Sequence, residues 1–198
     1  MNTLVDDVGS FPLPAQIDKG SFDKAYVQTR QAISTGKDIR NDKFLFSNFC
    51  EVITDSFAKK LATGLDVVSY PQHYDMYKQV TDLIYKVMDK GTYVVDERHA
   101  ILPEVYVIDV EAKELSEKLG KRIPLRVCIA GPLDLYSKTI GTVFYRDILL
   151  MFAETVRRLA KNSILDSKYV KTEVVSLDEP SFGFQDLFAD RDATVDVL

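Results

Sequence analysis

The chain is poor in cysteine and histidine, with two residues of each, and it contains no tryptophan. Cys50 and Cys128 lie far apart, which favours a reduced, cytoplasmic protein over a disulfide scaffold. The first residues lack the basic start and apolar core of a signal peptide. No apolar run approaches the roughly 18 residues that a membrane helix needs. The net charge is −5 and the basic residues are dispersed, so we expect neither nucleic acid nor a membrane as a partner.

The scarcity of histidine and cysteine also limits the metal chemistry that the chain can support. His73 and His99 have no second histidine or cysteine at metal-ligand spacing, so no zinc site is expected from them, and both are interpreted as surface residues. Cys50 and Cys128 fall in apolar segments and are expected to be buried, inert thiols. The sequence contains neither a phosphate-loop motif nor a dinucleotide glycine fingerprint.

Strand and helix patterns alternate along the 198 residues, which we expect to form a single domain spanning 1–198. Hydrophobic periodicity predicts helices at 22–33, at 44–61, at 76–88 and from Asp147, taken as an N-cap. It predicts strands at 4–8, 66–70, 93–95, 124–129 and 174–177, while 105–110 could be a strand or the start of a helix. The alternation, without a linker or repeat, predicts βα units and a parallel sheet.

The fold class expected from this pattern is α/β, either a doubly wound sheet or a barrel. A (β/α)8 TIM barrel has eight strands and typically about 250 residues. About five βα units therefore predict an apparently incomplete barrel of that type. A sheet that stops after five strands leaves an open edge, so we expect pairing with another chain or cover from the carboxyl-terminal tail.

Two short motifs at predicted strand ends could carry chemistry. Asp178 and Glu179 follow a strand rich in β-branched residues, and adjacent side chains on an extended segment point to opposite sides. They are therefore not spaced as a paired acid and base, and alone they are typical of a turn with one solvated and one helix-capping acid. Near the start, Gly9 would let a ligand approach the backbone, and Ser10 offers N–H and hydroxyl donors for a carboxylate. An ordinary loop is the alternative there.

Taken together and in order, the motifs resemble one known family. Val8-Gly9-Ser10-Phe11-Pro12, Gly64-Leu65-Asp66-Val67-Val68 with Asp75-Met76, Ile129-Ala130-Gly131-Pro132-Leu133 and Leu177-Asp178-Glu179-Pro180 all fall at or beside predicted strand ends. The chain resembles the amino-terminal part of the catalytic barrel of the cobalamin-independent methionine synthase family, particularly its short archaeal type. Uroporphyrinogen decarboxylase-like barrels of the same superfamily are the alternative.

The resemblance implies a set of binding residues. In that family the Gly-Ser segment and the aspartate of Asp-Glu-Pro hold the amino-acid part of homocysteine, which implies that Val8, Gly9, Ser10 and Asp178 do so here. Glu179, Tyr70 and His73 are possible residues of the surrounding shell. No residue of this chain is expected to be catalytic in itself.

The resemblance also implies zinc as the family's cofactor, binding the homocysteine sulfur as thiolate, which then attacks a methyl donor such as methyl-folate or methyl-corrinoid. The family's zinc ligands come after Asp-Glu-Pro, and we expect this chain to lack them. The family also usually has an acidic residue just after the second strand, where this chain has Ser69-Tyr70.

Three functional hypotheses follow. The first is an S-methyltransferase that passes a methyl group to homocysteine in methionine biosynthesis. The second is a catalytically inactive, truncated or diverged paralogue. The third is one half of a split enzyme, with another chain completing the barrel; a homodimer is a further possibility.

Overall fold

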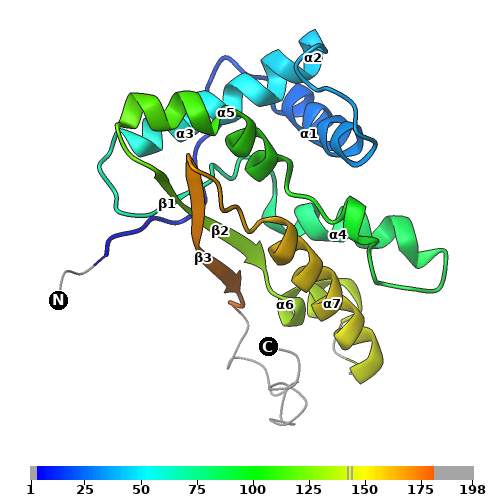
Figure 1. The fold of residues 1–198 in the computed structure, drawn as a ribbon. Coiled ribbons are helices and arrows are strands. Elements are labelled where there is room, and N and C mark those ends of the chain that lie inside the picture. The colour runs from blue at the N-terminus through cyan, green and yellow to red at the C-terminus, as the bar shows by residue number, and fades with distance from the viewer. Residues whose placement is uncertain (1–3, 142, 144, 181–198) are drawn as a thin grey trace.

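The computed structural model describes residues 4–141, 143 and 145–180, which form a mixed α/β fold (Figure 1). About half of the chain is helical, and three strands form one sheet. The strands are β1 (Val68–Ser69), β2 (Ile123–Ala130) and β3 (Val170–Asp178). The helices are α1 (Lys19–Ser34), α2 (Lys43–Leu45), a π-helical turn (Phe46–Cys50), α3 (Glu51–Leu61), α4 (Met76–Met88), a 3-10 turn (Glu97–His99), α5 (Pro103–Leu119), α6 (Pro132–Thr139) and α7 (Arg146–Asn162).

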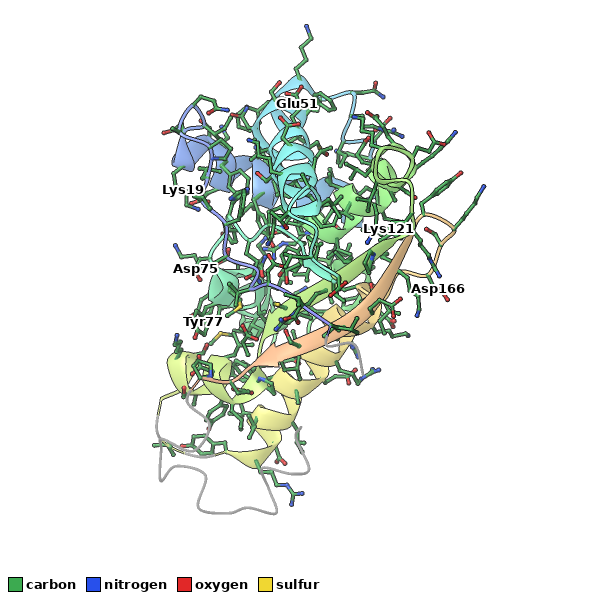
Figure 2. All side chains as sticks on the ribbon, turned by 90° about the vertical axis from the view of Figure 1, so that its left-hand side faces the viewer. Lys19, Glu51, Asp75, Tyr77, Lys121 and Asp166 are labelled. Carbon is green, nitrogen blue, oxygen red and sulfur yellow. The ribbon has the colours of Figure 1, made fainter. Side chains whose placement is uncertain are left out.

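The sheet is parallel, with its strands in the order β1-β2-β3. The amino-terminal segment lies beside β1, because the Val5 carbonyl accepts a hydrogen bond from the Val67 N–H at 3.2 Å and Ser10 forms a parallel bridge with Gln72. Four segments thus run side by side in chain order. Their carboxyl ends meet at one end of the sheet, which we call the carboxyl end. In Figure 2, Lys121 and Asp166 mark the opposite end, where β2 and β3 begin.

Alternation along β2 separates the two faces of the sheet. Leu125, Val127 and Ile129 are fully buried and belong to the core that the helices build against the sheet. Arg126 and Cys128 point to the other face, where the Ser176 hydroxyl donates to Cys128 Sγ at 3.2 Å. The helices therefore pack on one face, while the other carries polar side chains.

Most of the predicted elements are confirmed. Residues 76–88 form α4, residues 22–33 lie within α1, and the ambiguous stretch 105–110 is part of helix α5. The predicted strands at 66–70, 124–129 and 174–177 contain β1, β2 and β3, although β1 covers only two residues.

Four local predictions were wrong. Residues 4–8 and 93–95 are extended but form no strand. Tyr145, and not Asp147, is the N-cap of α7, and Asp147 lies in the first turn. The stretch 44–61 is not one regular helix, because a π-helical turn interrupts it between α2 and α3.

The prediction that both thiols are buried is confirmed, since Cys50 and Cys128 are free and inaccessible. Burial raises the pKa of the Cys50 thiol to about 12. Among the helices of the described ranges, none combines the length and the apolar character needed to cross a membrane.

Candidate functional site

The carboxyl end of the sheet brings the predicted motifs to one side of the molecule. The Gln72 N–H donates to the Gly9 carbonyl at 2.9 Å, and its side-chain Nε2 donates to the Cys128 carbonyl at 3.1 Å. The Gly131 N–H donates to the Asp178 carbonyl at 2.9 Å. The Gly-Ser loop, the Gly-Pro turn and the Asp-Glu-Pro turn are thus tied together. About three interstrand spacings, roughly 15 Å along a flat sheet, separate the first from the last.

Close approach of two segments explains the glycine of the Gly-Ser loop. A Cβ at Gly9 would lie 2.2 Å from Oε1 of Gln72, so no larger residue fits without displacing that side chain. The flanking Val8 and Ser10 are exposed. The loop therefore presents Ser10 outward while the glycine secures it against the segment that follows β1.

A buried lysine, which the sequence interpretation missed, holds this loop from below. Lys60 is 3% exposed, and its ammonium lies 2.6 Å from a carboxylate oxygen of Asp7. It also donates to the Val8 and Gly9 carbonyls at 3.2 and 3.4 Å. A lysine at the end of a helix usually lies on its solvated face. Lys60, however, is seven residues after Ile53 and so falls on the apolar stripe of the helix, and this spacing is the sequence feature that indicates its burial.

His73 is buried, so the interpretation of this residue as a surface histidine was wrong. Nδ1 lies 2.9 Å from the Phe11 carbonyl and Nε2 lies 2.9 Å from the Ser56 hydroxyl. A carbonyl can only accept, so Nδ1 carries the proton and Nε2 accepts from Ser56. Burial lowers the pKa of His73. Both nitrogens are occupied by the protein, and the ring serves to anchor the loop.

Tyr70, one of the two residues at which the resemblance would place an acid, is also an internal support. Its ring is fully buried, and its hydroxyl donates to the Cys128 carbonyl at 2.7 Å. The hydroxyl accepts from Nε2 of Gln72 at 2.8 Å. Burial raises the pKa of Tyr70 well above its usual value. The residue therefore stays neutral and contributes no negative charge to the carboxyl end.

Glu179 caps a helix. Its two carboxylate oxygens accept from the Leu133 and Asp134 N–H groups, both at 2.9 Å, at the start of α6. Its pKa is raised by burial, against the effect of these two hydrogen bonds. A Cβ at Gly131 would lie 2.2 Å from the Glu179 carboxyl carbon, which explains the glycine of the Gly-Pro turn.

Of the adjacent acids Asp178 and Glu179, Asp178 is the one whose carboxylate is available to a ligand. It is half-buried at the end of β3, and within 4–141, 143 and 145–180 its carboxylate has no hydrogen-bond or ion-pair partner. An ionised carboxylate at this position can accept hydrogen bonds from an ammonium group.

A polar cluster on the open face of the sheet was not predicted. Arg126 donates from Nη1 to an Asp6 carboxylate oxygen at 2.6 Å and from Nη2 to the Ser176 hydroxyl at 3.2 Å. Its guanidinium thus connects the amino-terminal segment to β3 across β2. These contacts join residues 120 and 50 positions apart, for which the sequence carries no local signal.

Zinc, the cofactor that the resemblance implies, does not fit the described side chains. Nowhere in the described ranges do three or more histidine, cysteine, aspartate or glutamate side chains gather as a metal site. Cys128 contacts serine hydroxyls and His73 has both nitrogens occupied. Comparison with known proteins adds no assignment: no family model, curated protein or solved structure matches the chain.

Proposed function

We propose that this chain forms the amino-acid-binding part of a methionine synthase-like barrel, in which a methyl group passes to homocysteine. One observation carries the proposal: the amino-terminal segment, β1, β2 and β3 run parallel in chain order, with the Gly-Ser, Gly-Pro and Asp-Glu-Pro motifs at their carboxyl ends. Successive parallel strands with ligand-binding loops at their carboxyl ends are how a (β/α)8 barrel is built.

The proposed binding residues match the two charges of an amino acid. Ser10 is exposed and offers donors to the substrate carboxylate, and Asp178 offers a carboxylate to its ammonium. Val8 and Gly9 position the Ser10 backbone. Curvature of the sheet into a barrel brings side chains that point inward from these ends toward one another.

The described part of the chain carries no step that needs zinc, because its side chains do not fit the metal. The proposal is therefore that this part binds homocysteine, while the groups that activate its sulfur and receive the methyl-folate or methyl-corrinoid donor lie elsewhere. They belong to the rest of the same barrel or to a partner chain, and an inactive paralogue would retain the amino-acid site alone. We propose a cytoplasmic location, since both cysteines are free thiols.

Calorimetric titration with homocysteine and with 4-mercaptobutyrate, which lacks the ammonium, tests the proposal. The wild-type chain should bind homocysteine more tightly. Asp178→Ala should weaken homocysteine binding about tenfold or more, as expected for a charged hydrogen bond, and should abolish the preference between the two compounds.

Glu173→Ala is the matched control, because Glu173 is an exposed acid on the same strand, where it pairs with Lys171 at 2.8 Å. Homocysteine affinity should be unchanged in this variant. Equal homocysteine affinity in the wild-type chain and Asp178→Ala would refute the assignment.

A further inference from the structure

A second candidate site lies away from the carboxyl end of the sheet. A cleft of about 530 Å³ opens between the last turns of α1 and α4 and the segment 95–99. This volume is within the usual range for small-molecule sites. Helix α4 begins near the carboxyl end, just after the segment that holds Gln72 and His73. Its last turn lies about 20 Å along the helix from there, so the cleft is separate from the proposed homocysteine site.

The cleft combines an apolar lining with several positive charges. The apolar side chains come from all three walls, and they are Val27, Leu83, Val87 and Val95. The cationic side chains are Arg30, Lys86, Lys90 and Arg98. In the part of the chain that the structure describes, the exposed ammonium groups of Lys86 and Lys90 have no carboxylate within ion-pair distance.

Arg30 is the buried cation of the cleft, with only 3% of its surface exposed. Nη1 donates to the Gln79 carbonyl at 2.7 Å, and the guanidinium lies over the Tyr26 ring at 5.3 Å. Nη2 is buried and has no hydrogen-bond partner among the described residues. A buried charge is screened less than an exposed one, so Arg30 adds a strong positive field to the cleft.

The negative groups of the cleft do not cancel its positive charge. Asp96 is the one acidic side chain in the lining; it lies 3.4 Å from Nε of Arg98 and 3.8 Å from Nδ1 of His99. The ends of α1 and α4 each contribute about −0.5 charge at most. Four cations against one carboxylate and two helix ends leave an excess of about two positive charges, which the buried Glu104 carboxyl beside Arg30 reduces where it is ionised.

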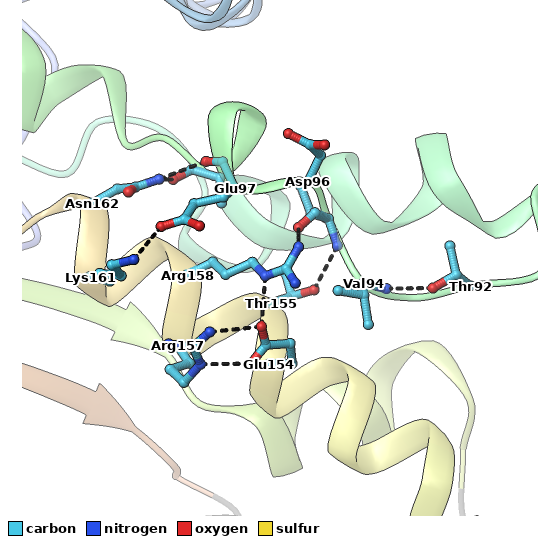
Figure 3. Close-up of polar contacts among 12 residues, drawn as sticks. Thr92, Val94, Asp96, Glu97, Glu154, Thr155, Arg157, Arg158, Lys161 and Asn162 are labelled. Carbon is cyan, nitrogen blue, oxygen red and sulfur yellow. Dashed lines mark hydrogen bonds and ion pairs between the residues drawn. The ribbon is translucent and has the colours of Figure 1, made fainter.

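The wall formed by residues 92–99 is held in place by α7, as Figure 3 shows. The Val95 N–H donates to the Thr155 hydroxyl at 3.0 Å, and Arg158 donates to the Val95 carbonyl at 2.8 Å. Asn162 donates to the Glu97 carbonyl at 2.7 Å. The cleft is therefore formed before any ligand enters, which lowers the entropic cost of binding.

We propose that this cleft binds a small phosphorylated organic molecule with about two negative charges and an apolar portion. The excess charge matches a phosphate monoester, which carries about two negative charges near neutral pH. The unpaired cations at the mouth are lysines, whose compact ammonium groups bind phosphate as point charges, while Nε of the exposed Arg98 lies 3.4 Å from Asp96. The apolar side chains contact the organic portion.

Calorimetry with phenyl phosphate, inorganic phosphate and phthalate tests the proposal. Phenyl phosphate should bind about tenfold more tightly than inorganic phosphate, which lacks the apolar portion, and than phthalate, which carries its two charges on carboxylates. Lys86→Glu and Lys90→Glu should each weaken phenyl phosphate binding about fivefold or more. Lys78→Glu is the matched control, because Lys78 is an exposed lysine of the same helix outside the cleft.

Three results would overturn the inference. The first is no saturable binding of phenyl phosphate to the wild-type chain up to millimolar concentration. The second is a loss of phenyl phosphate affinity in Lys78→Glu as large as in Lys86→Glu, and the third is phthalate binding as tightly as phenyl phosphate. Circular dichroism of each variant shows that the substitution leaves the fold intact. Homocysteine affinity should not change in the lysine variants, which separates this site from the proposed function.

Discussion

At the scale of single residues, Glu104 is a buried acid whose pKa is raised strongly. It is fully buried on α5, where Oε1 accepts from Nε2 of Gln79 at 2.8 Å and Oε2 has no partner among the described residues. Burial raises the pKa of Glu104 to about 7. Since the unfolded chain ionises this group near pH 4.5, the folded protein binds one more proton between the two values. The stability due to this proton is complete below about pH 4.5 and is lost as the pH rises through about 7.

Glu104→Gln should remove this pH dependence. Glutamine keeps the shape and the contact with Gln79 but cannot ionise, so at pH 8 the variant should be more stable by up to about 3 kcal/mol. At pH 4.5 the difference should nearly vanish. Urea unfolding at both pH values measures the effect, with the exposed Glu117→Gln of the same helix as control. An equal fall in stability with pH in both the wild type and Glu104→Gln would contradict the prediction.

The sequence indicated which residues lie at the carboxyl end of the sheet but not the structural role of each. Gly9, Gly131 and Asp178 lie at the same end of the sheet, as their positions at strand ends suggested. His73, however, is used as a buried anchor, and its role depends on Ser56 and Phe11, which are distant in sequence. Local patterns identify which residues end a strand, whereas burial is decided by the elements that pack over them.

At the scale of elements, α6 illustrates how one carboxylate can join a strand to a helix. Glu179 follows β3 and fills the start of α6, where the first N–H groups of a helix have no internal partner. The φ of Gly131 is −76°, so its backbone is compatible with any residue, and only the contact with Glu179 requires glycine there.

Gly131→Ala should destabilise the protein by about 1–3 kcal/mol, the cost of leaving buried polar groups unsatisfied, because the new methyl group displaces the Glu179 carboxylate. In a Glu179→Ala background the same change should cost almost nothing. A double-mutant cycle measured by urea unfolding gives the coupling between the two sites. Additive effects would show that the glycine is required for another reason.

Helix positions were more predictable than the connections between elements. The strong apolar stripe of residues 76–88 defines α4 without any help from its neighbours. The π-helical turn Phe46–Cys50 interrupts a stripe that looks continuous in the sequence, where no local pattern marks the change of helix type. The stretch 93–95 has strand composition, but side chains of α7, including Thr155 and Arg158, take the hydrogen bonds that a neighbouring strand would make.

At the scale of the whole molecule, the described sheet ends at β3, whose outer edge has no partner strand among the described residues. Val175 and Leu177 are 36% and 38% exposed there. Both share the face of Val127 and Ile129, which the helices cover further into the sheet. An unpaired strand edge can pair with another chain, so we expect a second copy of the chain to pair here.

Leu177→Lys should therefore shift the chain toward the monomer, because a lysine at a sheet edge opposes pairing with another chain. Sedimentation velocity over a range of protein concentrations measures the change. Tyr85→Lys is the control, since Tyr85 is 52% exposed on α4, away from the sheet edge. An identical distribution of species in wild type and Leu177→Lys would show that this edge does not mediate association.

Sequence patterns predicted the parallel arrangement of the described sheet, because alternating strands and helices leave few other topologies. They did not reveal the cationic cleft, whose walls come from α1, α4 and residues 95–99. Nor did they reveal that Lys60 lies beneath the Gly-Ser loop. Each of these features joins side chains from segments that are remote in sequence, and only the packed molecule brings them together.

The contacts of the amino-terminal segment have a consequence for the order of assembly on the ribosome. Val5, Gly9 and Asp6 bond to Asp66, Gln72 and Arg126, which are 61, 63 and 120 positions later in the chain. These residues leave the ribosome long after the first ten, and the last of them belongs to β2. Residues 5–9 therefore reach their final position only after much later residues, including Arg126 of β2, have been synthesised.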